Sequence, residues 1–462
     1  MARVEKRASM SWKLILAVAV LAGCNVSGED PSDSRDEDSV DSHGGGPSPR
    51  DAGGQTRWVH TVRSEGSSDA PVAVGQDGQG HILTLGNHRT PIDFGEGPVG
   101  GPSGASVLVV SKYAPEGGLL WARLLEAPQR PGVSPYVRGQ ALAIDEEGSV
   151  LLLGMQSGGL ELGGSVLPPG PFLARLDANG QPRWARALPT SATELAVSRK
   201  GDITLAGVLT GRVDFGDGPR TGNGHPFLVR YGSEGKPRWV YVDSERGVPM
   251  DLAQDDAGDL YLTGGRFPPT SPLLFPFLSR LSDRGVLQWT RQLEGAAGLM
   301  MSVAAHGDHV AVSGYFTGSF LFQGAPLSAS TSRGFALTYG KDGAERWGLL
   351  LGSTWGMVEM DQGSGLVIAG RYAGGEDFGL GLGELTGYPG STNLYVLRLQ
   401  RPTGKAQWMR TYPSASSLPV DLSVPRQGAS ALVGTFRAPV DFGTGPRTPG
   451  TGANAFVLQL EK

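Results

Sequence analysis

Few side chains in this sequence have the types and spacing that catalysis or metal binding needs, and most of them lie in stretches that predict turns. The stretch His306–His309 (HGDH) holds two imidazoles, but no third metal ligand is near it in sequence. The pattern DFGxGP occurs at Asp93–Pro98, Asp214–Pro219 and Asp441–Pro446, with a partial copy at Asp377–Gly381. Its carboxylates are too few for the roughly 6–8 oxygens that calcium prefers. We therefore expect turns at both patterns, with Phe anchoring the DFG loop and glycines at positive φ, and no metal site.

Linear motifs of catalysis are missing from the sequence. It has no His-Glu-x-x-His, no P-loop and no Gly-x-Ser-x-Gly elbow. The acids of IDEEG, QDDAG and LDANG are residues that tight turns prefer. The net charge is −5, and no basic face or aromatic-basic motif indicates nucleic-acid binding. We predict a protein that is not an enzyme and uses no cofactor. The alternative is an enzyme whose groups are drawn from several repeats.

The only cysteine, Cys24, follows a basic start and the apolar run LILAVAVLAG. This run is too short for a comfortable membrane span and is typical of a secretory signal. The stretch LAGC resembles a bacterial lipobox, in which the cysteine is acylated and becomes the first residue after cleavage. The resemblance implies a signal peptide over residues 1–23 and lipidation of Cys24. Because Asn25 follows the cysteine, it also implies the outer membrane, on the periplasmic side or the cell surface.

Residues 24–54 are acidic, rich in Ser and Gly, and almost devoid of large apolar side chains. Such a segment cannot bury enough surface to offset the entropy lost on ordering. We predict a disordered tether that joins the lipidated Cys24 to a folded body over residues 55–462.

A repeated unit dominates the folded body. Tryptophans recur 50 to 63 residues apart, in each case with a glycine four residues earlier. Each unit reads as two hairpins of alternating strands, for example TELAVSRKGDITLAGVL followed by PFLVRYGSEGKPRWVYV. The repeated tryptophans fall on the last strand of each unit, where we expect them to pack between units; they are Trp58, Trp121, Trp184, Trp239, Trp289, Trp347 and Trp408.

Seven such units predict a closed ring. One four-stranded sheet without helices cannot bury both faces, whereas sheets stacked radially around an axis can. Phe456 aligns with the first residues of the other third strands, such as Phe172, but no tryptophan follows it. The strand around Trp58 supplies the missing one. The fold class is therefore all-β, a seven-bladed β-propeller of four-stranded antiparallel blades, closed by the N-terminal strand joining the last blade.

The AxDxxGxxxLxG hairpin followed by DFG resembles the bacterial β-propeller repeat often called SBBP, found in secreted and lipid-anchored proteins. The copy RPTGKAQW also looks like the tryptophan-docking motif of quinoprotein dehydrogenases and of the eight-bladed outer-membrane assembly lipoprotein. The chain departs from both of these in having seven units and no paired cysteines. The resemblance implies a fold and a cellular location rather than an activity.

Binding is expected where the loops are long. In a four-stranded blade, the second-to-third and interblade loops lie on one face, and they differ from blade to blade here. Varied loops on a rigid scaffold usually carry function. Trp355 is the one tryptophan of the predicted folded body outside the repeated position, and Tyr136, Arg138, Tyr372 and Tyr388 are expected on the same face. Aromatic and Arg side chains are enriched at binding hot spots.

These observations predict a monomeric, lipid-anchored envelope scaffold that binds a protein partner on its long-loop face and touches the membrane only through Cys24. A carbohydrate- or matrix-binding surface lipoprotein is the alternative binding function. No feature of the sequence identifies the partner or glycan.

Overall fold

The computed structural model describes residues 53–62, 70–89, 92–93, 98–99, 105–129, 132, 134–268, 271–352, 354–388, 392–414, 416–424, 429–450 and 453–462. All of them belong to the compact unit Pro49–Lys462. The predicted signal peptide, Cys24 and most of the predicted tether lie outside the described residues. Within the described ranges the secondary structure is entirely β, and no helix there is long and apolar enough to cross a membrane.

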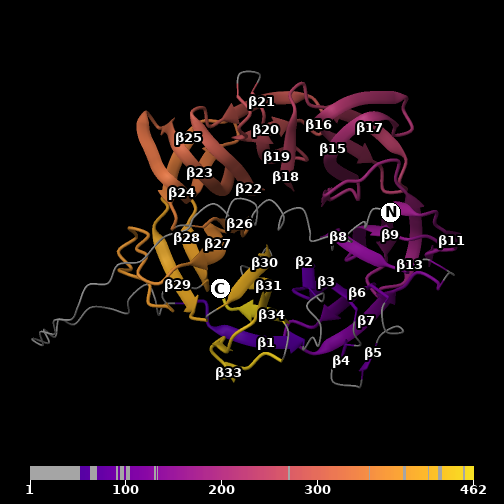
Figure 1. The fold of residues 1–462 in the computed structure, drawn as a ribbon, viewed down its shortest axis with the longest axis horizontal. Coiled ribbons are helices and arrows are strands. Elements are labelled where there is room, and N and C mark those ends of the chain that lie inside the picture. Colours follow the sequence, from indigo (N-terminus) through magenta and orange to yellow (C-terminus); the bar gives the residue numbers. More distant parts are fainter. Residues whose placement is uncertain are drawn as a thin grey trace, which may run out of the picture. The chain divides into compact units, whose positions relative to one another are not determined.

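Seven four-stranded antiparallel sheets form a ring, so the predicted fold class is confirmed (Figure 1). We number the blades 1 to 7 by their innermost strands. These strands surround the ring axis; they are β2 (Ala70–Gln76), β8 (Val137–Ile144), β14 (Glu194–Val197), β18 (Gly247–Gln254), β22 (Ala296–His306), β26 (Gly356–Met360) and β30 (Ser417–Ser423).

The other strands follow outward in the same blade order. The second strands are β3 (Ile82–His88), β9 (Val150–Gln156), β15 (Ile203–Asp214), β19 (Leu260–Arg266), β23 (His309–Phe322), β27 (Gly365–Tyr372) and β31 (Ser430–Phe436). The third strands are β6 (Val107–Tyr113), β12 (Gly170–Leu176), β16 (Pro219–Tyr231), β20 (Phe275–Leu281), β24 (Ala325–Gly340), β28 (Asn393–Gln400) and β34 (Asn454–Leu460). The outermost strands are β7 (Leu119–Leu125), β13 (Pro182–Ala187), β17 (Pro237–Val242), β21 (Leu287–Gln292), β25 (Glu345–Leu350), β29 (Ala406–Tyr412) and β1 (Thr56–Val62).

Local turn chemistry explains why the strands pair as hairpins. In blade 1, Asp77 Oδ1 accepts the backbone N–H groups of Gln79 and His81, both at 3.0 Å. Gly80 closes the turn at φ +84°, a conformation that a residue with Cβ rarely adopts. Asp145 and Asp255 repeat this arrangement in blades 2 and 4, so the acids of IDEEG and QDDAG are turn residues.

The ring is closed between the two ends of the folded body. β1 pairs antiparallel with β34, from Thr56 opposite Leu460 to Val62 opposite Ala455. The last sheet therefore runs β1-β34-β31-β30, with three strands from the end of the chain and one from its start. This is the predicted closure, and it leaves no blade with only three strands.

The glycine-tryptophan pattern joins neighbouring blades. The glycine of one blade packs on the tryptophan of the preceding blade: a Cβ on Gly285 would lie 2.6 Å from the Trp239 ring, and one on Gly54 2.6 Å from the Trp408 ring. The Trp239 indole also donates to the Asp283 carbonyl of the next blade at 3.1 Å. Four other indoles donate in the same way; they are those of Trp58, Trp121, Trp289 and Trp347.

The core is continuous around the ring because blades pack face to face. One buried cluster, for example, joins Val396 of blade 6 to Leu432 and Phe456 of blade 7. At roughly 25 cal/mol for each Å² of apolar surface buried, such interfaces supply much of the stabilising free energy of a β protein without helices.

We predict that Gly54→Ala destabilises the ring more than Gly80→Ala. Both glycines have a φ that disfavours Ala, +72° and +84°, at a cost of about 1–2 kcal/mol each. Only Gly54 packs directly on an indole, whereas the atom closest to a Cβ on Gly80 is 3.6 Å away, on Pro115. Overpacking should add about 1–3 kcal/mol at Gly54. Urea denaturation of both variants checks this, and equal losses would contradict the closure role of Gly54.

Candidate functional site

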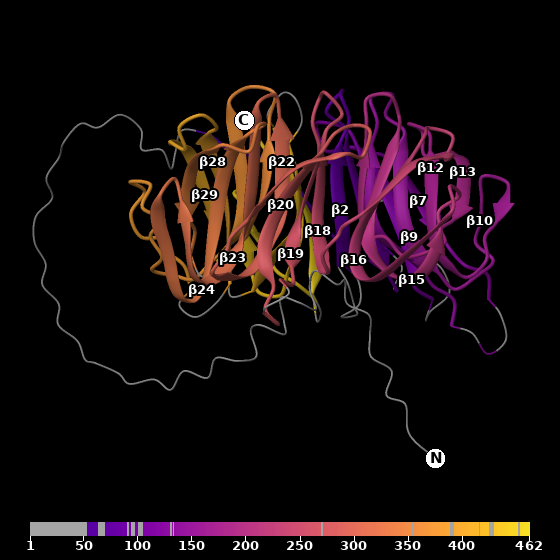
Figure 2. The ribbon, with the colours of Figure 1, turned by 90° about the horizontal axis from the view of Figure 1, so that it is seen from above.

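The two faces of the ring differ in the length of their connections (Figure 2). Short turns join the first to the second strand and the third to the fourth; we call this the short-turn face. The second-to-third and interblade connections lie on the opposite, long-loop face. Three of these second-to-third connections contain small hairpins of their own: β4 (Ile92–Asp93) with β5 (Pro98–Val99), β10 (Glu161–Leu162) with β11 (Ser165–Val166), and β32 (Val440–Asp441) with β33 (Pro446–Arg447).

On blade 2, the start of β8 presents an aromatic-guanidinium pair. Arg138 Cζ lies 5.6 Å from the ring centroid of Tyr136, and both side chains are half-buried. The pKa of Arg138 is lowered, first by burial and then by the positive charge of Arg89. A nearby like charge disfavours the charged form of a side chain, so the Arg89 guanidinium adds to the effect of burial on Arg138.

On blade 6, Trp355 and Arg371 stand at the same level of the long-loop face. Gly356 pairs with Gly370. Trp355, just before β26, and Arg371 on β27 are therefore one residue closer to the long-loop face on each side of this pair. The Thr354 hydroxyl donates to the Arg371 carbonyl. Trp355 is half-buried and packs on the cluster shared by blades 6 and 7.

The Arg371 guanidinium is half-buried, and within the described residues no acceptor or carboxylate pairs with it. Burial lowers its pKa. A half-buried cation without a counter-charge is costly, so this position favours an incoming carboxylate or other oxyanion.

Two of the tyrosines predicted for binding have different environments. Tyr372 is 0% exposed, and its hydroxyl donates to the Thr386 carbonyl at 2.8 Å. The prediction that Tyr372 lies on the binding surface is therefore wrong, because the side chain holds its own loop from the inside. Tyr388 is 56% exposed, and its backbone N–H donates to Asn393 Oδ1 at 3.2 Å, which ties the loop to β28.

The DFG segments form Phe-anchored turns. Asp214 Oδ1 accepts from the N–H groups of Gly216 and Gly218 at 2.8 and 3.1 Å, and both glycines have positive φ. Phe215 is 3% exposed. Asp441 makes the same two bonds, to Gly443 and Gly445. Residues 94–97 of the first copy lie outside the described part of the chain.

The two histidines of HGDH flank the two-residue turn between β22 and β23 and have different partners. His306 Nδ1 lies 3.2 Å from Asp256 Oδ2, whereas His309 Nδ1 lies 2.7 Å from Arg346 Nη1. Burial and then the Arg346 charge lower the pKa of His309. Among the described residues no group of three or more His, Cys, Asp or Glu could hold a metal ion.

Acids from three innermost strands interact near the ring axis. The pKa of Glu359 on β26 is raised well above its usual value, first by burial and then by the charges of Asp251 on β18 and Asp421 on β30. The two aspartates are structural: Asp251 Oδ2 accepts from Val303 N at 2.9 Å, and Asp421 Oδ2 from Val74 N at 2.8 Å. Each of the two aspartate carboxylates thus joins its blade to the innermost strand of the next, whereas the surroundings of Glu359 favour its protonated form.

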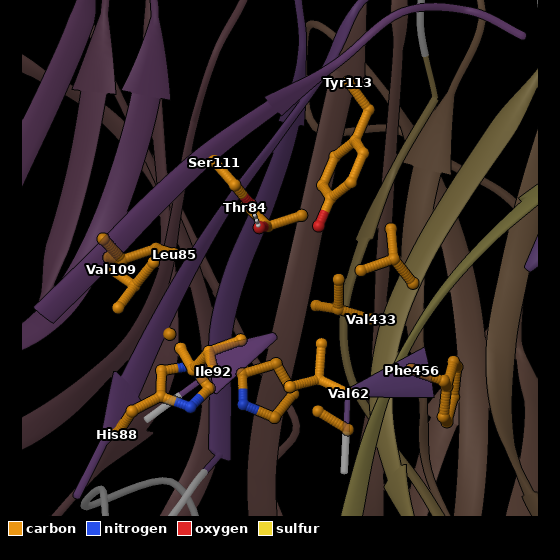
Figure 3. Close-up of a pocket in the computed structure, with 14 residues that line it drawn as sticks. Val62, Thr84, Leu85, His88, Ile92, Val109, Ser111, Tyr113, Val433 and Phe456 are labelled. Carbon is orange, nitrogen blue, oxygen red and sulfur yellow. Dashed lines mark hydrogen bonds between the residues drawn. The ribbon is translucent and has the colours of Figure 1, made fainter. Parts of the chain in front are cut away.

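A small space between blades 7 and 1 is part of the core (Figure 3). It encloses about 30 Å³ and is lined mainly by apolar side chains such as Val62, Leu85 and Phe456. The Thr84 and Ser111 hydroxyls meet there at 2.6 Å. This volume holds about one or two water molecules rather than a substrate.

Sequence reasoning missed Arg371 and Glu359. Arg371 follows the glycine that ends the second-strand pattern, in AGRY, at the position that Asn87 and Thr435 occupy in blades 1 and 7. An alignment of the seven copies marks it as the one charged residue at that position. Glu359 has no such signal, because its shifted pKa depends on acids in other blades.

The topology defines the chain as a seven-bladed β-propeller. No protein-family model and no curated protein matches it. Among solved structures, it is similar to the WD40 domain of Pan2 from Neurospora crassa, with a TM-score of 0.44 and 9% identity over 85% of this chain and 89% of that chain. It is also similar to BamB from Moraxella catarrhalis, with a TM-score of 0.37 and 14% identity over 87% and 98% of the two chains. The propeller domain of the Trilobed protease from Pyrococcus furiosus has a TM-score of 0.44 and 8% identity, over 82% and 97%. At these identities the likeness concerns the fold alone.

We predict that Glu359→Gln stabilises the protein at neutral pH. Because the folded-state pKa of Glu359 is raised, the wild-type free energy of unfolding falls as pH rises from the unfolded-state value of about 4.3 towards the folded-state pKa. Gln carries no proton to lose, so the gain should be largest at pH 7.5 and vanish below about pH 4. Urea denaturation across this range checks it, with the exposed Glu234→Gln as control. Parallel profiles for wild type and Glu359→Gln would contradict the assignment.

Proposed function

We propose that the protein is a lipid-anchored propeller of the cell envelope that binds a protein partner on its long-loop face, without catalysis. In this proposal the chain is a monomeric scaffold with SBBP-type repeats. Cys24 attaches it to the outer membrane, and the acidic segment 24–54 spaces the ring from the bilayer.

The observation that carries the proposal is the half-buried Arg371, which has no counter-charge among the described residues and lies opposite Trp355 in the register of β26 and β27. An uncompensated cation next to an aromatic side chain is stabilised by a carboxylate that arrives with apolar surface around it. A protein partner with an Asp or Glu side chain flanked by apolar residues provides both. The Arg138–Tyr136 pair across the same face and the exposed Tyr388 extend the surface.

The anchor is supported by the sequence LAGC at Cys24, which follows an apolar run of signal-peptide length. A single lipid chain gives only marginal membrane binding, whereas multiple acyl chains give stable attachment. The resemblance to a lipobox implies the stable kind.

We expect Cys24→Ala to release the protein from the membrane fraction. The variant keeps the whole propeller sequence but loses the one thiol that acylation needs. Fractionation of cells, followed by detection of the chain in the pellet and the soluble fraction, measures the result. A variant that stays in the pellet after high-salt washing would overturn the anchor.

A photo-crosslinking residue at Tyr388 should capture an envelope protein in intact cells. Val286 is the matched control, since it is 58% exposed, close to the 56% of Tyr388, but lies on the third-to-fourth turn of the short-turn face. We expect a discrete adduct from position 388 and none from 286. Trp355→Ala and Arg371→Gln should each weaken the captured complex about tenfold or more, as for hot-spot residues.

Arg371→Gln should leave the thermal stability unchanged or higher, because it removes a half-buried charge without a counter-ion. Loss of the adduct in a folded variant therefore reports binding rather than misfolding. Equal adducts from both positions, or none where a known envelope complex is captured in parallel, would contradict the docking face. A glycan recovered with the chain in place of a protein would favour the carbohydrate-binding alternative.

A further inference from the structure

An ion pair recurs on the short-turn face of the ring. In five of the seven blades, the residue opposite the repeated tryptophan on the third strand is a Lys or Arg, which can pair with an acid of the first turn; blades 5 and 7 have Thr338 and Gln459 there. Lys112 Nζ lies 3.0 Å from Asp77 Oδ2 in blade 1. Arg175 pairs with Asp145 in blade 2, and Arg398 with Asp361 in blade 6.

The equivalent cation of blade 4 is also paired. Arg280 Nη2 lies 2.6 Å from Asp259 Oδ2. In these four blades the cation is buried or nearly so, and a carboxylate on the first turn of the same blade compensates its charge.

Blade 3 has the cation but lacks an acid at the first position of the turn, the position from which Asp77 and Asp145 pair with the cation in blades 1 and 2. Its turn residue is Ser198, in VSRKG, where blades 1, 2 and 4 have Asp. The turn itself is conserved, since Gly201 N donates to the Ser198 carbonyl at 2.9 Å and Asp202 N donates to Ser198 Oγ at 3.0 Å. The Ser198 hydroxyl thus accepts the backbone hydrogen bond that the Asp carboxylate accepts in blades 1, 2 and 4, but it carries no charge.

Arg230, the cation of blade 3, is consequently under-compensated. It is 4% exposed, and its Nη1 has no hydrogen-bond partner. Its contact with Asp202 Oδ2 is long, 3.6 Å from Nε, and Asp202 also pairs with Arg238 at 2.9 Å. One carboxylate therefore serves two guanidinium groups. Burial lowers the pKa of Arg230, which agrees with a charge that the protein does not fully balance.

Arg230 lines a groove of about 280 Å³ between blades 3 and 4. Two of the acids in this groove already have partners: Asp255 Oδ2 lies 2.7 Å from Lys341 Nζ, and Asp256 Oδ1 lies 2.6 Å from Arg199 Nη2. Lys200 and Arg284 also line the groove, are exposed, and form no ion pair within the described residues.

The groove also has an apolar surface. The Trp239 ring lines it, and the indole N–H is held by the Asp283 carbonyl at 3.1 Å. The Asp283 side chain also lines the groove, so its lining has five cationic side chains, Arg199, Lys200, Arg230, Arg238 and Arg284, and four acids, Asp202, Asp255, Asp256 and Asp283. The excess charge in the groove is positive.

We infer that this groove binds a small organic carboxylate, whose carboxyl group takes the place beside Arg230 that the turn Asp occupies in blades 1, 2 and 6. The rest of the ligand lies against the Trp239 ring. Lys200 and Arg284 attract the anion, and the exposed side chains of Lys200 and Arg238 move aside to admit it. Phosphate shares the oxyanion chemistry and is the competing ligand of the same site.

Ser198→Asp tests the site directly, because it places in blade 3 the turn carboxylate that pairs with the cation in blades 1 and 2. Titration of the full chain with succinate, at constant ionic strength against chloride, should raise the melting temperature and change the tryptophan fluorescence of the wild type. Ser198→Asp should bind succinate about tenfold or more weakly, as expected when one charge-assisted bond is already satisfied. It should also melt higher than the wild type without ligand, since Arg230 gains a partner.

Arg230→Gln should lose the succinate response without the gain in melting temperature. Asp145→Ser provides a matched control, because it leaves Arg175 of blade 2 without its acid while keeping the groove of blades 3 and 4 intact; its response at Trp239 should equal that of the wild type. A larger response to phosphate than to succinate that disappears in Ser198→Asp would assign the site to phosphate and overturn the carboxylate. No succinate response in the wild type, or an equal response in Ser198→Asp, would overturn the site itself.

Discussion

The packing of each repeated tryptophan on a glycine of the next blade is the interaction on which the rest of the structure depends. The indole covers a backbone that has no Cβ, and in five blades it also donates to a carbonyl of the same turn, as Trp289 does to Lys341 at 3.0 Å. A side chain at Gly343 or Gly54 would occupy the space of the ring. Because every blade provides a tryptophan to one neighbour and a glycine to the other, the contact can only be satisfied all round in a closed ring. The N-terminal segment makes this contact with both neighbouring blades: Gly54 packs on Trp408, and Trp58 packs on Gly117.

Because these contacts lie on the outermost strands, they place few constraints on the turns and loops of the two faces. On the short-turn face the turns are short, and a buried or nearly buried ion pair occurs in blades 1, 2, 4 and 6. Such pairs add little net stability, but breaking one leaves a buried charge uncompensated. Blade 3 shows this break at Arg230, next to a groove. On the long-loop face the loops vary, and Arg371 and Arg138 lie where strands begin or end. Each face thus presents one arginine, Arg371 or Arg230, whose charge the described residues do not fully balance.

Near the ring axis, carboxylates bind backbone N–H groups rather than cationic side chains. Asp251 and Asp421 use their carboxylates to accept backbone N–H groups of the next innermost strand, so their charge stabilises the assembly of blades. Burial and then the charges of these two aspartates raise the pKa of Glu359. Acids of three innermost strands are therefore coupled across the axis, and two of them also join neighbouring blades.

The sequence by itself determined the fold class, the number of blades and the closure by the strand around Trp58. These depend on local signals: alternation with period two, Asp and Gly at tight turns, and a glycine four residues before each tryptophan. The side-chain environments depended on the tertiary structure. Tyr372 is buried beneath its own loop rather than exposed, Arg371 is left without a counter-ion, and Arg230 shares Asp202 with Arg238. Burial and charge compensation are set by residues of other strands and blades, and a pattern read along the chain does not contain the distances between them.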